Sequence, residues 1–330
     1  MRLQLKHRGN VCKRIFILCT MVTALGSVLT IAAHAATKVR IAYLVADSML
    51  PALYAKDKGY FATAGLEPDF IAVQGGPAVV AAIASGDADI GYAAPVPPIN
   101  ARIRGVPVKM FLELGQEVDP DKKFIWLVAS KASGITSVAG AKGKKVSFNA
   151  NGGLCELTWR AHLAAAGMKI EDVQPVVLPF PEQEAALEQG NIDATCTINP
   201  FMASINGNAK IGAAIVAAGT LPELKQPLMN DALFATETWL GANGEAAVAI
   251  ARVMDKARKE LLADRAALEA AAVKYMELKP EDAKSFNLPI VHDSMTVDQG
   301  ELQRILDAMV ATGMQPGPLK AADFSVETKY

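Results

Sequence analysis

The sequence lacks the signatures of the common enzyme classes. It has no G-x-S-x-G motif, no H-E-x-x-H motif, no P-loop and no G-x-G-x-x-G following a strand. Histidine is scarce as well, with four residues in the chain, and only His162 and His292 lie beyond residue 35. Two imidazoles are too few for most metal sites with nitrogen and sulfur ligands. We therefore expect no catalytic residue, no metal site and no cofactor.

An excess of basic charge is also missing. The chain has 33 Lys and Arg against 34 Asp and Glu, and residues 1–35 contain five of these cations and no acid. Removing them leaves 28 cations against 34 acids, a net charge of about −6. This balance excludes a basic surface for nucleic acid. The chain has no low-complexity tract, and a length of roughly 300 residues predicts two domains.

The first 35 residues have the features of an export signal. Basic residues between Arg2 and Arg14 precede the apolar run 15–33, and Ala33-His34-Ala35 places small residues where a signal peptidase requires them. We predict cleavage after Ala35 and a mature protein in the periplasm. A retained membrane anchor is the alternative for a run of this length.

One sequence unit occurs twice, about a hundred residues apart. Residues 81–95 (AAIASGDADIGYAAP) align with residues 185–200 (AALEQGNIDATCTINP), so that Gly86 matches Gly190 and Asp89 matches Asp193. Each copy has the pattern of a helix end, a glycine and a short buried strand. Any α/β protein can show this pattern, but its repetition predicts two similar lobes.

The rest of the chain supports two doubly wound lobes. Strands at 38–45 and 67–73 alternate with helices at 50–58 and after Gly75, and Asp47 and Ser48 are natural N-caps for the first helix. The pattern restarts with strands at 124–129, 146–150 and 173–178, and residues 247–274 and 301–313 have helical spacing. We assign residues 36–129 and 231–330 to lobe I and residues 130–230 to an inserted lobe II, with crossing segments at 124–129 and 233–236 that form a hinge.

Several segments resemble one known family of proteins. The segments are Pro51 to Phe61 (PALYAKDKGYF), Gly65 to Pro68 (GLEP), Ala82 to Gly91 (AIASGDADIG), Gly143 to Val146 (GKKV) and Ala166 to Met168 (AGM). They are similar to the periplasmic solute-binding proteins of ABC importers for nitrate, taurine, alkanesulfonates and thiamine-pyrimidine precursors. The resemblance implies a two-lobe α/β fold of periplasmic-binding-protein type II with a ligand cleft between the lobes. It also implies a monomer whose partners are a small-molecule ligand, a membrane permease and a separate ATPase.

The same resemblance implies that ligand residues lie in the turns that follow the strands. These residues are Asp47, Ser48, Met49, Gly75, Gly76, Pro77, Ala94, Pro95, Val96, Gln116, Asn151, Gly152, Gly153, Leu154, Asn199 and Phe201. The glycines can equally serve tight turns, and Asp47 and Ser48 can equally cap a helix. Asn199 and the run from Asn151 to Leu154 depart from the residues common in amino-sulfonate binders.

The ligand expected from these residues is a small organic anion, either a sulfonate or a carboxylate. Helix N-termini supply N–H donors, amide and apolar side chains complete the set, and no Arg or Lys lies in the assigned turns. A neutral pyrimidine is the alternative ligand. A ligand-presenting partner of a sensor kinase and a secreted enzyme are the alternative functions.

Two cysteines remain beyond residue 35, Cys155 and Cys196. The strand before Cys155 and the strand that holds Cys196 are expected to be neighbours, which would bring the Cα atoms within the ~7 Å that a disulfide permits. An oxidising compartment favours this bridge. Two buried thiols, or a reactive thiol at the start of a helix, are the alternatives.

Overall fold

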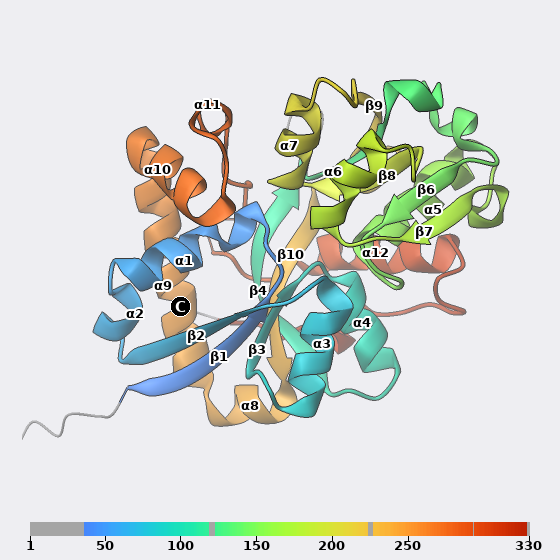
Figure 1. Cartoon of the computed structure of the whole chain (residues 1–330). Coiled ribbons are helices and arrows are strands. Elements are labelled where there is room, and N and C mark those ends of the chain that lie inside the picture. The colour runs from blue at the N-terminus through green and yellow to red at the C-terminus, as the bar shows by residue number, and fades with distance from the viewer. Residues whose placement is uncertain (1–35, 119–122, 224–226, 293, 329–330) are drawn as a thin grey trace, which may run out of the picture. The chain divides into compact units, whose positions relative to one another are not determined.

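The computed structural model describes residues 36–118, 123–223, 227–292 and 294–328. The predicted export signal and its cleavage after Ala35 lie outside these residues. Within the described ranges, no helix has both the length and the apolar character that crossing a membrane requires. The described chain forms two five-stranded sheets with helices packed against them (Figure 1).

The first sheet has the strand order β2-β1-β3-β10-β4. Its strands are β1 (Thr37–Tyr43), β2 (Leu66–Ala72), β3 (Ile90–Ala93), β4 (Val108–Glu117) and β10 (Leu228–Thr236). β1 pairs in parallel with β2 and β3, and β10 is antiparallel to both β3 and β4. β10 is longer than the predicted crossing at 233–236, and it joins this sheet between two strands that precede it by more than a hundred residues.

Helices connect and cover the first sheet. They are α1 (Leu50–Asp57), α2 (Tyr60–Thr63), α3 (Gly76–Ser85), α4 (Val96–Ile103), α8 (Glu237–Ala242), α9 (Gly244–Ala263), α10 (Arg265–Met276), α11 (Pro280–Ala283) and α12 (Gln299–Ala311). The connection from β1 to β2 and the connection from β2 back to β3 run in opposite directions across the sheet. Because both crossovers are right-handed, α1 and α3 cover opposite faces of this sheet (Figure 1). The predicted helix at 247–274 is two helices that meet at Asp264, whose carboxylate caps α10 by accepting from the Ala267 N–H at 3.0 Å.

The second sheet has the order β7-β6-β8-β5-β9. Its strands are β5 (Ile125–Ala129), β6 (Lys145–Phe148), β7 (Gln174–Val177), β8 (Ala194–Ile198) and β9 (Ala214–Ala218). Its helices are α5 (Leu154–Ala165), α6 (Phe180–Glu188) and α7 (Phe201–Gly207). β6 is parallel to β7 and β8, and β5 is antiparallel to β8 and β9. This order and these directions repeat those of the first sheet.

The repeated sequence unit builds the same local structure in both lobes. Asp89 accepts a hydrogen bond from the Arg40 backbone N–H at 2.8 Å and donates its own N–H to the Arg40 carbonyl at 2.9 Å. Asp193 does the same with the N–H and carbonyl of Lys145, both at 2.8 Å. Asp89 therefore fixes the start of β3 against β1, and Asp193 fixes the start of β8 against β6.

β5 pairs with β8 and β9, although the boundary expected after Ala129 assigns this strand to lobe I. We therefore propose that the lobes divide between Glu117 and Phe124 and again between Ala218 and Leu228. The Glu117 carboxylate lies at this division, where it accepts from the N–H groups of Phe124 at 3.0 Å and Thr220 at 2.7 Å. One buried side chain thus holds both connections between the lobes.

Candidate functional site

Three adjoining cavities lie where strand ends of the first lobe face strand ends of the second. A large cavity of about 220 Å³ and a central cavity of about 30 Å³ share Phe124 in their walls. A lateral cavity of about 80 Å³ shares Asn149 with the central one. We call this row of cavities the cleft. Ala94 follows β3 and Gly153 follows β6, so the cleft lies at carboxyl ends of parallel strands, where open α/β sheets bind ligands.

Nine of the predicted ligand residues line the cleft. They are Asp47, Gln116 and Asn199 in the large cavity, Gly76, Ala94, Gly153 and Leu154 in the central cavity, and Gly75 and Phe201 in the lateral cavity. The structure therefore brings together predicted residues from both lobes.

The other seven predicted residues do not line the cleft. They are Ser48, Met49, Pro77, Pro95, Val96, Asn151 and Gly152. Met49 and Val96 are fully buried in the core, and Asn151 is exposed. The amide that the central cavity contains belongs to Asn149, two residues before the predicted one. Gly152 instead joins the lobes, because its carbonyl accepts from the side-chain amide of Asn100 at 3.1 Å.

Asp47 and Ser48 do not cap α1, contrary to the sequence prediction. They form a 3-10 turn before the helix, and neither side chain accepts a hydrogen bond from a first-turn N–H of α1. The Ser48 hydroxyl instead donates to the carboxylate of Asp231 on β10. Asp47 and Asp231 are both almost completely buried, so the cleft walls contain two carboxyl groups from distant parts of the chain.

Burial changes the acidity of both groups. Burial raises the pKa of Asp231 to about 7, and the hydrogen bond from the Ser48 hydroxyl opposes this rise. Burial, followed by the negative charge of Asp231, raises the pKa of Asp47 well above its ordinary value. Asp231 therefore changes between a neutral acid, which can donate a hydrogen bond, and a carboxylate, which only accepts, close to neutral pH.

Two helix N-termini meet at the central cavity. Gly76 begins α3 and Leu154 begins α5, so unsatisfied backbone N–H groups and positive dipole ends come from both lobes. Glycine is needed at position 76 because a Cβ there would lie 2.5 Å from Cγ of Pro97. The central cavity thus combines donors that favour an anion with the titrating carboxyl group of Asp231.

Sequence reasoning missed several residues of the cleft. Asp231, Phe124 and Phe180 line the central cavity, and the segment 285–290 forms one wall of the large cavity. The sequence could have identified Asp231 as a candidate cleft residue, because Asn230 and Asp231 interrupt an otherwise apolar strand. The segment 285–290 carried none, because it reaches the cleft only through the path of the chain after α11.

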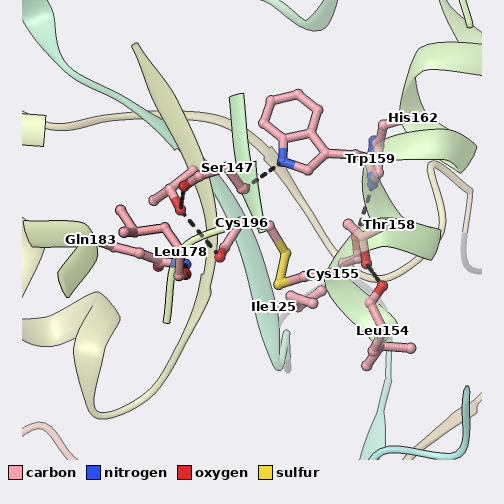
Figure 2. Close-up of a disulfide and its surroundings, with 12 residues drawn as sticks. Ile125, Ser147, Leu154, Cys155, Thr158, Trp159, His162, Leu178, Gln183 and Cys196 are labelled. Carbon is pink, nitrogen blue, oxygen red and sulfur yellow. Dashed lines mark hydrogen bonds between the residues drawn. A yellow bond between two sulfur atoms is a disulfide. The ribbon is translucent and has the colours of Figure 1, made fainter. Parts of the chain in front are cut away.

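Cys155 and Cys196 form the predicted disulfide, with Cα atoms 5.5 Å apart (Figure 2). The expected adjacency is confirmed, because β6 and β8 pair in parallel. Figure 2 shows the bridge beside Ile125 and Leu154, and all three of Ile125, Leu154 and Cys155 line the central cavity. The disulfide therefore fixes α5, and with it one helix N-terminus of the cleft, to the middle of the second sheet.

Comparisons with known proteins agree with this architecture. An aliphatic sulfonates-binding protein of Escherichia coli (strain K12) is 36% identical over 126 residues, which is 38% of each chain. A 4-amino-5-hydroxymethyl-2-methylpyrimidine phosphate synthase of Aspergillus parasiticus is 26% identical over 265 residues, 77% of this chain and 74% of that protein.

Among solved structures, the alkanesulfonate-binding protein of Xanthomonas axonopodis pv. citri superposes with a TM-score of 0.73 at 18% identity. The superposition covers 88% of this chain and 98% of that one, so the two proteins share the two-lobe α/β fold that the sequence predicted. The family model described as NMT1/THI5 like matches residues 47–267, which include strands of both sheets and most of the cleft residues. This chain belongs to the NMT1/THI5-like family.

Proposed function

We propose that this protein is the periplasmic solute-binding component of an ABC importer. The observation that carries the proposal is the cleft, whose walls come from both lobes and from carboxyl ends of strands. The family membership and the predicted export signal support it. In this proposal the protein captures a small solute, performs no reaction on it, and delivers it as a monomer to a membrane permease driven by a separate ATPase.

Closure about the hinge is the mechanism that this architecture suits. A ligand that contacts both lobes binds the closed state better than the open one, and this difference in affinity drives closure. Glu117 holds both connections between the lobes, and Asn100 reaches across them to Gly152. The permease can then distinguish loaded from empty protein by the relative position of the lobes.

A small organic anion, either a sulfonate or a carboxylate, is the first candidate ligand. The N-termini of α3 and α5 supply N–H donors, each worth up to ~1 kcal/mol for an anion. The apolar walls of the central cavity, including Leu154 and Phe180, suit an apolar body. The sulfonate-binding relatives support this class of ligand.

A neutral heterocycle with N–H donors, such as an aminopyrimidine, is the second candidate, and Asp231 is the observation that favours it. An ionised carboxylate in the central cavity accepts hydrogen bonds from such a ligand and repels an anion. The relative named as a pyrimidine phosphate synthase supports this candidate.

The two candidates differ in the sign of their pH dependence. Asp231 has a pKa of about 7, so it is neutral at pH 5.5 and ionised at pH 8.5. An anion should bind more tightly at pH 5.5, and an N–H-donating heterocycle should bind more tightly at pH 8.5. Thermal-shift titration with sulfonates, carboxylates and aminopyrimidines at both values distinguishes them, because ligand at ~100 Kd stabilises by ~2.7 kcal/mol.

Asp231→Asn is the matched variant, because it keeps the shape of the side chain and removes the titration. It should reduce the difference between the two pH values for whichever ligand binds, and Asp47 is the other cleft carboxyl group with a raised pKa. Turnover of a bound compound by the purified protein would overturn the binding proposal in favour of a secreted enzyme. Co-purification with the ectodomain of a sensor kinase, and with no permease, would replace import by ligand presentation.

A further inference from the structure

Three side chains that can each ligate a metal ion meet between β4 and the start of α12, outside the cleft walls. Glu113 lies on β4, Glu301 lies in the first turn of α12, and His292 lies in the segment that leads to this helix. One ligand atom from each residue lies within 4.8 Å of the other two. The two carboxylates are almost completely buried, whereas 38% of the His292 side chain is exposed.

The hydrogen bonding of this cluster is incomplete. Glu113 Oε1 and Glu301 Oε2 are buried and have no hydrogen-bond partner among the residues that the structure describes. A buried carboxylate oxygen without a partner is costly, and here two of them lie in one small cluster. Asp298 adds a negative charge beside both glutamates, and Arg304 adds a positive charge beside Glu113.

The contacts of His292 conflict as well. Its Nε2 lies 2.8 Å from Glu301 Oε1 and 2.7 Å from Nε2 of Gln116, so an ionised Glu301 calls for a donor at this nitrogen, whereas the Gln116 amide calls for an acceptor. One imidazole nitrogen cannot fill both roles. A lone pair of His292 and the carboxylate of Glu301 thus face the same small region. A cation in that region satisfies both groups without a proton.

We propose that Glu113, His292 and Glu301 form a binding site for a divalent transition-metal ion, with Zn²⁺ the best match. Two carboxylate oxygens and one imidazole nitrogen are a donor set that suits Zn²⁺ or Mn²⁺, and Zn²⁺ accepts four ligands including water. Ca²⁺ requires six or more oxygen ligands, which these three residues cannot supply. Sequence reasoning expected no metal site because histidine is scarce, and it could not show that the fold brings Glu113 and Glu301 together.

The site has a structural consequence beside the cleft. Gln116 contacts both His292 and Glu301, and its backbone N–H donates to the carbonyl of Ile290 at 2.7 Å. Ile290 and Gln116 also line the large cavity. A metal ion at this site would hold the segment before α12 against β4, and so hold one wall of the cleft in place.

The test uses the exported protein without a histidine tag, dialysed against a chelator and titrated with ZnCl₂, MnCl₂ or CaCl₂ by calorimetry and thermal melting. We expect one Zn²⁺ per chain and a rise in melting temperature of about 5 °C at saturation. Ca²⁺ should bind at least about tenfold more weakly. The result does not depend on the identity of the transported solute, so it stands or fails separately from the proposed function.

His292→Ala and Glu301→Gln should each weaken Zn²⁺ binding by at least about tenfold. His292 is partly exposed, so its substitution tests the site even if Glu301→Gln impairs folding. The control is Glu281→Gln, which changes an exposed acid outside the cluster and should leave Zn²⁺ binding unchanged. Absence of saturable binding, or equal binding by wild type and His292→Ala, would overturn the proposal.

Discussion

In each lobe one strand, β1 or β6, pairs in parallel with two neighbours, and the strand that follows the connection from the other lobe, β10 or β5, joins the sheet in the antiparallel direction. The aspartates of the repeated unit, Asp89 and Asp193, make the same two backbone hydrogen bonds. Beyond these shared hydrogen bonds, the buried side chains of the two lobes differ. The residue three positions after Asp89 is the buried Tyr92, whereas the residue three positions after Asp193 is the disulfide-bonded Cys196.

This difference shows how one backbone arrangement is stabilised in two ways. The helices α3, α4 and α12 pack against strands of the first sheet, and its middle is filled by large side chains such as Tyr92 and Phe234. The second sheet has fewer helices, and a covalent bridge ties α5 to its central strand β8. Sequence repetition therefore fixes the backbone pattern, while the side chains that stabilise it have diverged.

The largest expected effect is the loss of the bridge in the second lobe. Replacing Cys155 and Cys196 together by alanine should lower the free energy of unfolding by about 4 kcal/mol, because the bridge closes a segment with a sequence separation of 41. Urea unfolding of the oxidised wild type and the double variant measures this change. A difference below about 1 kcal/mol would mean that packing alone holds the second lobe, as it does the first.

The next effect tests the packing of the first lobe. A Cβ at Gly91 would lie 2.4 Å from Cζ of Phe234, which is paired opposite it on β10. Gly91→Ala should therefore lower the free energy of unfolding by about 1–3 kcal/mol. A second change, Phe234→Leu, should recover part of this loss, since the two residues share one space.

The matched position in the second lobe is Thr195, which is buried and whose hydroxyl accepts from Ser147 Oγ at 2.6 Å. Thr195→Ser keeps this hydrogen bond and should change the unfolding free energy by less than about 1 kcal/mol. Equal effects of Gly91→Ala and Thr195→Ser in chemical denaturation would show that the two interiors do not differ in the way described.

The features that could be predicted from the sequence are those that follow from the repeated unit and from the alternation of strands and helices. Asp89 and Asp193 could be matched because a short unit recurs, and the parallel strands of both lobes follow from apolar runs bounded by glycine. The disulfide was predictable because adjacency of β6 and β8 follows from the doubly wound order.

Long-range features could not be derived in this way. Asp231 reaches the cleft because β10 returns between β3 and β4, and a strand prediction does not say which side chains face a cavity. The meeting of Glu113 with Glu301 depends on how α12 packs behind β10. Local periodicity contains no information about such contacts, because they are set by tertiary packing.

The smallest expected effect compares the two matched aspartates themselves. The carboxylate of Asp89 accepts from the Arg40 side chain at 2.7 Å and 3.1 Å in addition to the backbone N–H. Among the described ion pairs, Asp193 has no such partner, and it binds only the backbone of Lys145. Asp89→Asn should therefore lower the free energy of unfolding by about 0.5–1 kcal/mol, because 43% of the Arg40 side chain is exposed. Asp193→Asn, which keeps an acceptor, should lower it by less.

The pH dependence of this difference has a definite sign. Burial alone would raise the pKa of Asp89, but hydrogen bonds from the Arg40 side chain and backbone outweigh it and lower the pKa. A lowered pKa in the folded state means that the stabilisation is fully present above the ordinary pKa of aspartate, ~4, and is lost as the pH falls through the lower folded value. The difference in unfolding free energy between wild type and Asp89→Asn should thus be constant from pH 5 to 8 and should disappear below pH 3. It should also shrink in 1 M salt, because exposed ion pairs are screened there. Urea midpoints of the wild type and of Asp89→Asn at pH 3 and pH 7 measure this difference. A difference that persists at pH 3 would show that the amide lowers stability through its shape and not through the lost charge.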